Sequence, residues 1–211
     1  MAPAIDAAAR GEAAAVAEAA AWLRAGGLVA FPTETFYGLA ADPGSPAAVE
    51  ALFDVKGRAP GAALPVVAAS IAQVVERCGP MAGATARLAR AFWPGPLALL
   101  VDAPAWMAGG VHAGTGAVAV RVPAHGLARA LAAAFGAPVT ATSANRSGEP
   151  PASSAAALAP IAADARVLVV DGGPTPGGAP STIVDARGAR AVCVRAGAVP
   201  WDRVLELLYD A

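Results

Sequence analysis

The sequence predicts an α/β fold in which a mixed β-sheet is covered by helices on both faces. Short apolar runs rich in Val and Leu alternate along the chain with helical patterns, and these runs are nearly continuous in apolar residues. Both features are typical of strands that lie buried between helices. Some strands follow one another without a helix between them, which favours a mixed sheet. A chain of 211 residues, 56% of them hydrophobic, is predicted to form one domain spanning residues 1–211.

The predicted elements follow in order from the N-terminus. A helix spans 12–25 and stops at Gly26-Gly27, and the run 28–31 is a buried strand. Ser45 and Pro46 are typical of a helix start, and this helix runs towards Lys56. The remaining predictions are strands within 65–70, 97–101, 117–123, 138–145, 166–173, 181–185 and 191–197, helices at 71–78, 81–92, 127–135 and 201–210, and a loop at 172–180.

Charge and cysteine content exclude several classes of protein. The net charge is −1, so the chain has no large positive field for binding a nucleic-acid backbone. Cys78 and Cys193 are too few for a disulfide framework and are predicted to be reduced. Charged residues interrupt the alanine-rich N-terminus, and no uncharged apolar run of about 18 residues follows, so neither a signal peptide nor a membrane span is expected. We therefore expect a soluble, cytoplasmic protein.

Several common catalytic motifs are absent from the sequence. The residue after Lys56 is glycine rather than Ser or Thr, which excludes a nucleotide P-loop, and no G-x-G-x-x-G follows a strand. No G-x-S-x-G nucleophile elbow is present. His112 and His125 have no acidic or cysteine partner at metal-ligand spacing, so no metal site is predicted from protein ligands.

Lys56 is the single lysine in a chain with 15 lysines and arginines. It stands with Arg58 on either side of a glycine, which lets the backbone turn while two cations point towards one anion. A compact ammonium and a planar guanidinium are poorly interchangeable at such a site. The pair is thus a candidate phosphate site, and the alternative, that one surface lysine survived by chance, stays open at this point.

Other polar residues cluster where predicted strands end. Thr35 follows the strand at 28–31, and Ser143 and Asn145, the latter the single asparagine, follow the strand that begins at Pro138. Open α/β sheets bind ligands at such strand ends, although Ser and Asn also favour turns for local hydrogen bonds. Arg121 and Arg195 both end short apolar strands, so their side chains are predicted to converge on one cleft.

Eight segments, in this order and spacing, resemble the YrdC family of threonylcarbamoyl-AMP synthases. They cover about 26–199 and read GGLVAFPTETFYGLAAD, LFDVKGR, FWPGPLALLV, VAVRVPAH, PVTATSANRSGEPPASS, VDGG, PSTIVD and VRAGAV. The resemblance implies a three-layer α/β fold with a twisted mixed sheet around a large cleft, without the extra C-terminal domain of longer members. It also implies an enzyme that makes L-threonylcarbamoyladenylate and pyrophosphate from L-threonine, bicarbonate and ATP, for a separate transferase that modifies tRNA.

The resemblance assigns roles to residues by position. It places ATP on Lys56, Arg58, Ser143, Asn145, Ser153, Ser181 and Arg195. Lys56 and Arg58 would act in catalysis by neutralising the leaving pyrophosphate. Thr35 and Arg121 would contact threonine, with Arg121 suited to its carboxylate. Mg²⁺ is expected with ATP, held mainly by phosphates and water.

The chain departs from the family pattern directly after Arg58. Ala59 and Ala63 stand at two proline positions, Ala62 at a position that is often polar, and Val67 at a histidine position near the threonine pocket. These departures leave open a related enzyme that makes a different carbamoyl-adenylate. The resemblance also leaves a second alternative, a double-stranded RNA-binding module, which the near-zero net charge disfavours.

Overall fold

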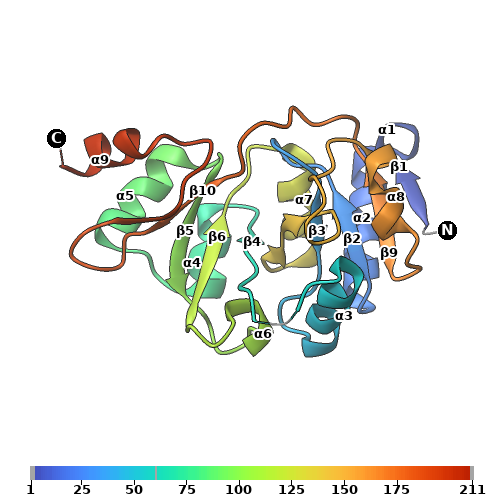
Figure 1. Cartoon of the computed structure of the whole chain (residues 1–211), viewed down its shortest axis with the longest axis horizontal. Helices are drawn as coiled ribbons and strands as arrows, with labels where there is room; N and C mark the ends of the chain where they lie inside the picture. The colour runs from blue at the N-terminus through green and yellow to red at the C-terminus, as the bar shows by residue number, and fades with distance from the viewer. Residues whose placement is uncertain (1–2, 60, 210–211) are drawn as a thin grey trace.

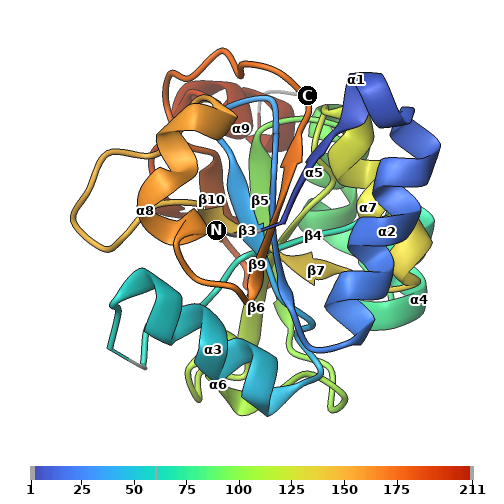
Figure 2. The same ribbon diagram turned by 90° about the vertical axis from the view of Figure 1, so that its right-hand side faces the viewer.

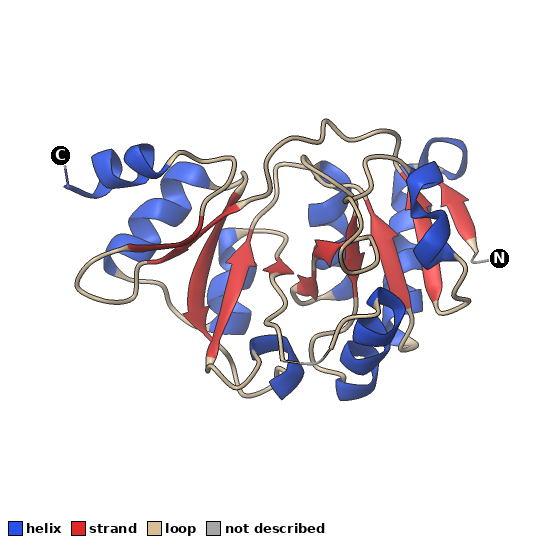
Figure 3. Cartoon of the chain, viewed as in Figure 1, coloured by secondary structure: helices blue, strands red, loops and turns tan. Residues whose placement is uncertain are grey.

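The computed structural model describes residues 3–59 and 61–209 (Figure 1). Its strands form two mixed sheets that lie side by side, with helices packed around both (Figure 3). The predicted mixed α/β class is therefore confirmed, while the division of the strands into two sheets was not predicted.

The first sheet has the order β1-β9-β2-β3-β8. Its strands are β1 (Ala4–Asp6), β2 (Leu28–Phe31), β3 (Gly38–Ala40), β8 (Thr142–Ser143) and β9 (Val167–Asp171). The strand β2 runs parallel to β9 and antiparallel to β3. Residues of β2 alternate between two cores, because Leu28 and Ala30 pack on one face and Val29 and Phe31 on the other. This sheet is thus buried on both faces, as the continuous apolar runs indicate.

The second sheet has the order β11-β10-β5-β6-β4-β7. Its strands are β4 (Val66–Val67), β5 (Leu97–Asp102), β6 (Ala117–Arg121), β7 (Val139–Thr140), β10 (Thr182–Asp185) and β11 (Val192–Arg195). The strands β5 and β6 form an antiparallel pair at its centre.

The helices cover both faces of the sheets. They are α1 (Ala7–Arg10), α2 (Glu12–Arg24), α3 (Pro46–Lys56), α4 (Ile71–Cys78), α5 (Gly83–Phe92), α6 (Gly109–His112), α7 (Gly126–Phe135), the 3₁₀ helix η1 (Ala155–Leu158), α8 (Ala159–Ala162) and α9 (Trp201–Tyr209). Figure 2 shows α2 and α7 on one side of β2 and β9, and α3 and α8 on the other. None of the helices in the described parts of the chain has both the length and the apolar character needed to span a bilayer.

Most predicted elements are present, with shorter strands than expected. The predicted strand within 65–70 is reduced to Val66–Val67, and α5 begins at Gly83 rather than at residue 81. The closing helix is α9, and its predicted last residue, Asp210, lies outside the described residues. Short elements without clear periodicity, including β1, β3, α6 and α8, were not predicted.

The segment 139–143 connects the two sheets. Its first part, β7, pairs with β4 in the second sheet, and its last part, β8, pairs with β3 in the first. Between them, the amide of Ala141 donates to the carbonyl of Pro65 at 2.8 Å. The hydroxyl of Thr140, buried at the same crossing, accepts the amide of Ala41 at 2.7 Å. The residues that follow, from Ser143 on, are thereby held at the junction of the sheets.

Candidate active site

A cavity of about 630 Å³ lies at the junction of the two sheets. Its wall includes Thr35 and Ser143 from the side of the first sheet, and Arg121 and Arg195 from the second. The charged residues that line it, among those described, are the arginines Arg58, Arg121 and Arg195 and the carboxylate of Glu149. The predicted convergence of Arg121 and Arg195 is confirmed, and the positive excess of the lining suits an anionic ligand.

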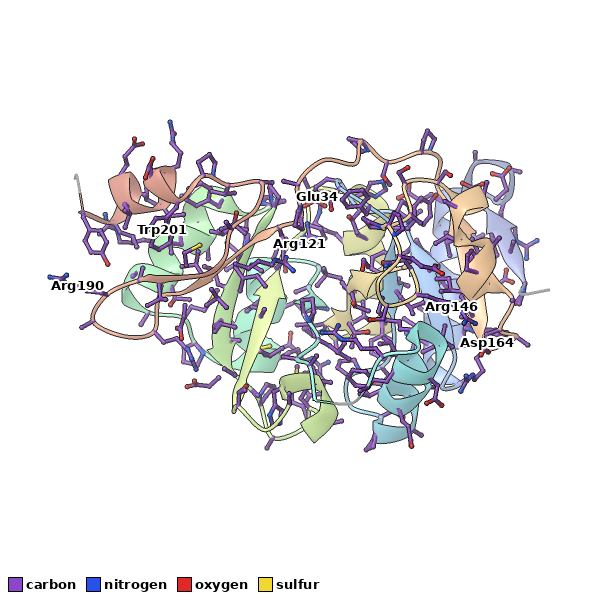
Figure 4. The ribbon with its side chains drawn as sticks, in the orientation of Figure 1. Glu34, Arg121, Arg146, Asp164, Arg190 and Trp201 are labelled. Atoms are coloured by element: carbon purple, nitrogen blue, oxygen red, sulfur yellow. The ribbon has the colours of Figure 1, made fainter. Side chains whose placement is uncertain are left out.

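Arg121 is the last residue of β6, and it is only 7% exposed. Its Nη1 donates to Oε1 of Glu34, which is its one hydrogen-bond acceptor within residues 3–59 and 61–209. Figure 4 shows the two side chains close together near the middle of the molecule, between the two sheets. Burial lowers the pKa of Arg121, and the nearby Glu34 carboxylate opposes this shift. Since a guanidinium has five N–H donors, most of those on Arg121 remain for a ligand.

Glu34 is a site residue whose partner was not predicted. Its second carboxylate oxygen, Oε2, is buried and has no hydrogen-bond partner among the described residues. The sequence signal was only its place between Thr33 and Thr35, because Arg121 is far away along the chain.

Arg195 at the end of β11 is tied to Ser181. Its Nη2 donates to the carbonyl of Ser181 at 2.6 Å and lies 3.0 Å from the hydroxyl of the same residue. Burial lowers the pKa of Arg195, and the positive charge of Arg121 lowers it further. The structure therefore brings Arg121, Ser181 and Arg195 to one cavity, as predicted.

The turn after β2 is fixed by its own side chains. The hydroxyl of Thr33 donates to the carbonyl of Phe36 at 2.7 Å and lies 3.2 Å from that of Thr35. The Tyr37 hydroxyl donates to the carbonyl of Gly173 at 2.7 Å, and burial raises its pKa to about 12. Tyr37 is fully buried, and it is also one of the residues around the cavity.

The loop between β9 and β10 runs along the top of the molecule from the first sheet to the second (Figure 1). It is attached to the turn after β2, because the amide of Gly177 donates to the carbonyl of Thr35 at 2.8 Å. Ser153 contacts this loop rather than the cavity: its carbonyl accepts the amide of Thr175 at 2.8 Å, and it is absent from the described lining. Ser153 is therefore not among the residues that line the cavity in this structure, and its contact with ATP stays a prediction.

Lys56 is also absent from the described lining of the cavity, although Arg58 is part of it. The side chain is 3% exposed, and Nζ donates to the backbone carbonyls of Ser143 and Asn145. The sequence correctly placed Lys56 at the end of α3, but the ammonium lies beneath the loop that follows β8 and not at the cavity surface. Burial lowers its pKa to about 8, and the positive charge of Arg58 contributes to this shift.

The lowered pKa of Lys56 predicts a change of stability with pH. Between about 8 and its ordinary value of 10.5, the folded state binds fewer protons at this site than the unfolded state. The contribution of Lys56 to the free energy of unfolding is therefore greatest above pH 10.5 and is lost as the pH falls towards 8. The loss is at most about 1.4 kcal/mol per pH unit. Urea unfolding of wild type and Lys56→Met at pH 7.5 to 10 checks this. A stability difference that is constant or falls with pH would contradict it.

The fold and cavity define a class of protein: an α/β protein with a cavity between two sheets, lined by arginines at strand ends, where such folds hold their ligands. Residues 21–197 match the model of the Sua5/YciO/YrdC family, which is described as "Telomere recombination". The chain belongs to this family, as its sequence motifs indicated.

Two relatives are named threonylcarbamoyl-AMP synthase. The one from Alkalilimnicola ehrlichii is 47% identical over 144 residues, covering 66% of this chain and 73% of the relative. The one from Bacillus subtilis is 39% identical over 191 residues, covering 90% of this chain and 55% of the relative. The chain thus spans about half the length of the B. subtilis protein.

Solved structures of Pyrococcus abyssi Sua5 share the fold. A variant of that protein superposes with a TM-score of 0.90 at 35% identity, covering 98% of this chain and 63% of the other. The same protein in complex with L-threonine gives a TM-score of 0.83 at 35% identity, covering 92% of this chain and 57% of the other.

Proposed function

We propose that this chain is an L-threonylcarbamoyladenylate synthase. The observation that carries the proposal is the convergence of Arg58, Arg121 and Arg195 on one cavity, in a chain whose relatives bear this name. Threonine's amine combines with bicarbonate or CO₂ to form a carbamate. A carbamate oxygen then attacks the α-phosphorus of ATP and displaces pyrophosphate, so that threonine, bicarbonate and ATP give the adenylate, pyrophosphate and water.

The nucleotide is assigned to residues that follow α3, that lie in or directly after β8, or that lie near β11. Arg58, Ser143, Asn145, Ser181 and Arg195 line the cavity. Guanidinium groups and hydroxyls are suitable donors for phosphate oxygens, and the arginines neutralise charge that builds up on the leaving pyrophosphate. Most of the rate acceleration then comes from alignment and charge rather than from side-chain acids or bases.

The amino acid is assigned to the turn after β2 and the end of β6. Thr35 and Arg121 line the cavity, and Arg121 has free donors for a carboxylate. Val67, the residue at the family's histidine position, lines the cavity and is the register partner of Arg121 across β4 and β6. Its apolar side chain cannot hydrogen-bond a substrate hydroxyl, so Val67 favours the second candidate, a synthase that accepts another amino acid.

The residues of the cavity are compatible with a metal ion that binds together with ATP rather than one held by protein ligands alone. Among residues 3–59 and 61–209, no three His, Cys, Asp or Glu side chains gather where they could hold a metal ion. Glu149 is the one carboxylate in the described lining. The Mg²⁺ of ATP would be held by phosphates, water and Glu149, and would neutralise phosphate charge.

Amino-acid selectivity tests the choice between the two enzyme functions. We expect bicarbonate-dependent pyrophosphate release with L-threonine to exceed that with L-serine, L-valine or L-alanine by about tenfold or more, from one or two polar and apolar contacts. The initial rate is measured with each amino acid at saturating ATP. A higher rate with another amino acid would favour the related carbamoyl-adenylate synthase.

Transfer of the threonylcarbamoyl group to tRNA would need a separate transferase. Direct RNA binding by this chain is a weaker candidate, since its net charge of −1 supplies little electrostatic attraction to a phosphate backbone.

A further inference from the structure

The segment 143–149 forms one wall of the cavity and rests on the end of α3. Ser143, Asn145 and Glu149 line the cavity from this segment. Beneath it, the Nζ of Lys56 donates to the carbonyls of Ser143 and Asn145, the latter at 2.8 Å. The amide of Ser147 donates in turn to the carbonyl of Lys56 at 2.8 Å. A single residue of α3 thus contacts the segment at three points.

Asn145 holds the same segment from within. Its Nδ2 donates to the carbonyl of Arg146 at 2.8 Å and to that of Glu149 at 2.7 Å. Both N–H donors of the amide are therefore used inside the segment. The remaining oxygen, Oδ1, is buried, has no partner among the described residues, and is an acceptor that cannot bind a phosphate oxygen.

The end of α3 places the Lys56 side chain for this contact. Gly57 adopts a left-handed conformation with φ of 58°, and its amide donates to the carbonyl of Asp54 at 2.9 Å. This cap ends the helix at Lys56, where an ammonium also complements the negative end of the helix dipole. The flexible stem and three donors of lysine allow contact with two differently oriented carbonyls, which a planar guanidinium fork matches poorly.

We propose that Lys56 and Asn145 are positioning residues that hold segment 143–149 in its ligand-binding shape before the ligand arrives, and that neither touches phosphate directly. The proposal deepens the proposed function, on which its kinetic part rests. The direct contacts to phosphate would then come from the guanidinium of Arg58 and the hydroxyl of Ser143, both of which line the cavity. The chain's single lysine and single asparagine would both be kept for contacts with backbone carbonyls.

Hydrogen exchange of the ligand-free protein tests the proposal without any substrate. In Lys56→Met and in Asn145→Asp, we expect the amides of Ser147 and Glu149, which donate to the carbonyls of Lys56 and Arg146, to exchange at least tenfold faster than in wild type. Arg58→Ala is the matched control, because its guanidinium lines the cavity and makes no hydrogen bond to the described residues of this segment. In this control, the amides of Ser147 and Glu149 should exchange at the wild-type rate. Unchanged exchange in both Lys56→Met and Asn145→Asp would overturn the proposal, even if their activity were lost.

Steady-state kinetics separates positioning from a general loss of folded enzyme. For the same two variants, we expect the KM for ATP to rise about tenfold and the KM for the amino acid to change less than twofold. A fall in kcat alone, with both KM values unchanged, would contradict a positioning role. If wild type forms no adenylate but the exchange result is obtained, the proposed function fails and the role of Lys56 and Asn145 in holding the segment stands.

Discussion

Arg121→Met is expected to reduce threonine-dependent pyrophosphate release by about a thousandfold and to lower the free energy of unfolding by about 3–5 kcal/mol. The activity falls because the free donors of this guanidinium are assigned to the substrate carboxylate. The stability falls because Glu34 would keep a carboxylate near the protein interior without its partner. Initial rates and urea unfolding measure the two effects separately.

The double variant Glu34→Gln/Arg121→Met distinguishes these two causes. Removing both charges of a buried pair is often close to neutral for stability, whereas removing one is costly. We expect the double variant to recover most of the lost stability and none of the activity. Recovery of activity together with stability would show that Arg121 supports the fold rather than the substrate.

Arg58→Ala is expected to lower kcat/KM for ATP by about 10²–10³-fold, with little effect on stability. The backbone amide of Arg58 caps α3 by donating to Phe53 at 3.0 Å, which alanine preserves. Its guanidinium forms no ion pair or hydrogen bond with the other described residues and lines the cavity, so it is free for phosphate. The measurement is the initial rate of pyrophosphate release over a range of ATP concentrations.

Arg190→Ala is the matched control for Arg58→Ala. Arg190 lies in the turn between β10 and β11 and points outward, away from the cavity, in Figure 4. Its removal deletes the same charge and should leave kcat/KM within twofold of wild type. Equal losses in both variants would point to a general effect of net charge rather than to a phosphate contact.

The parts of the site that follow local patterns could be predicted from the sequence. Ser45 and Pro46 at the start of α3 and the glycine after Lys56 are local signals, and the helix does end at Lys56 as predicted. Arg121 and Arg195 each stand at the end of an apolar strand, and both side chains line the same cavity.

Contacts between residues far apart in the chain could not be predicted in this way. Nothing local to Glu34 indicates that it pairs with Arg121, and nothing local to Lys56 indicates that its ammonium contacts carbonyls of the segment after β7. The change of sheet at Ala141 depends on partners in β3 and β4, which a strand pattern does not identify. Such features depend on the packing of the whole chain.

Lys56 illustrates the difference between finding a residue and finding its contacts. Its uniqueness in the sequence indicated that it is important, and the resemblance assigned it to phosphate. The structure places its ammonium on two backbone carbonyls, so the same residue is assigned to the shape of segment 143–149.

The proposed reaction joins L-threonine, bicarbonate and ATP into one adenylate in this cavity. The most direct measurement is incubation of the purified chain with all three, followed by mass spectrometry of the products, with each substrate omitted in turn. We expect threonylcarbamoyl-AMP and pyrophosphate only when all three are present. Formation of an adenylate without threonine, or no adenylate with all three substrates, would contradict it.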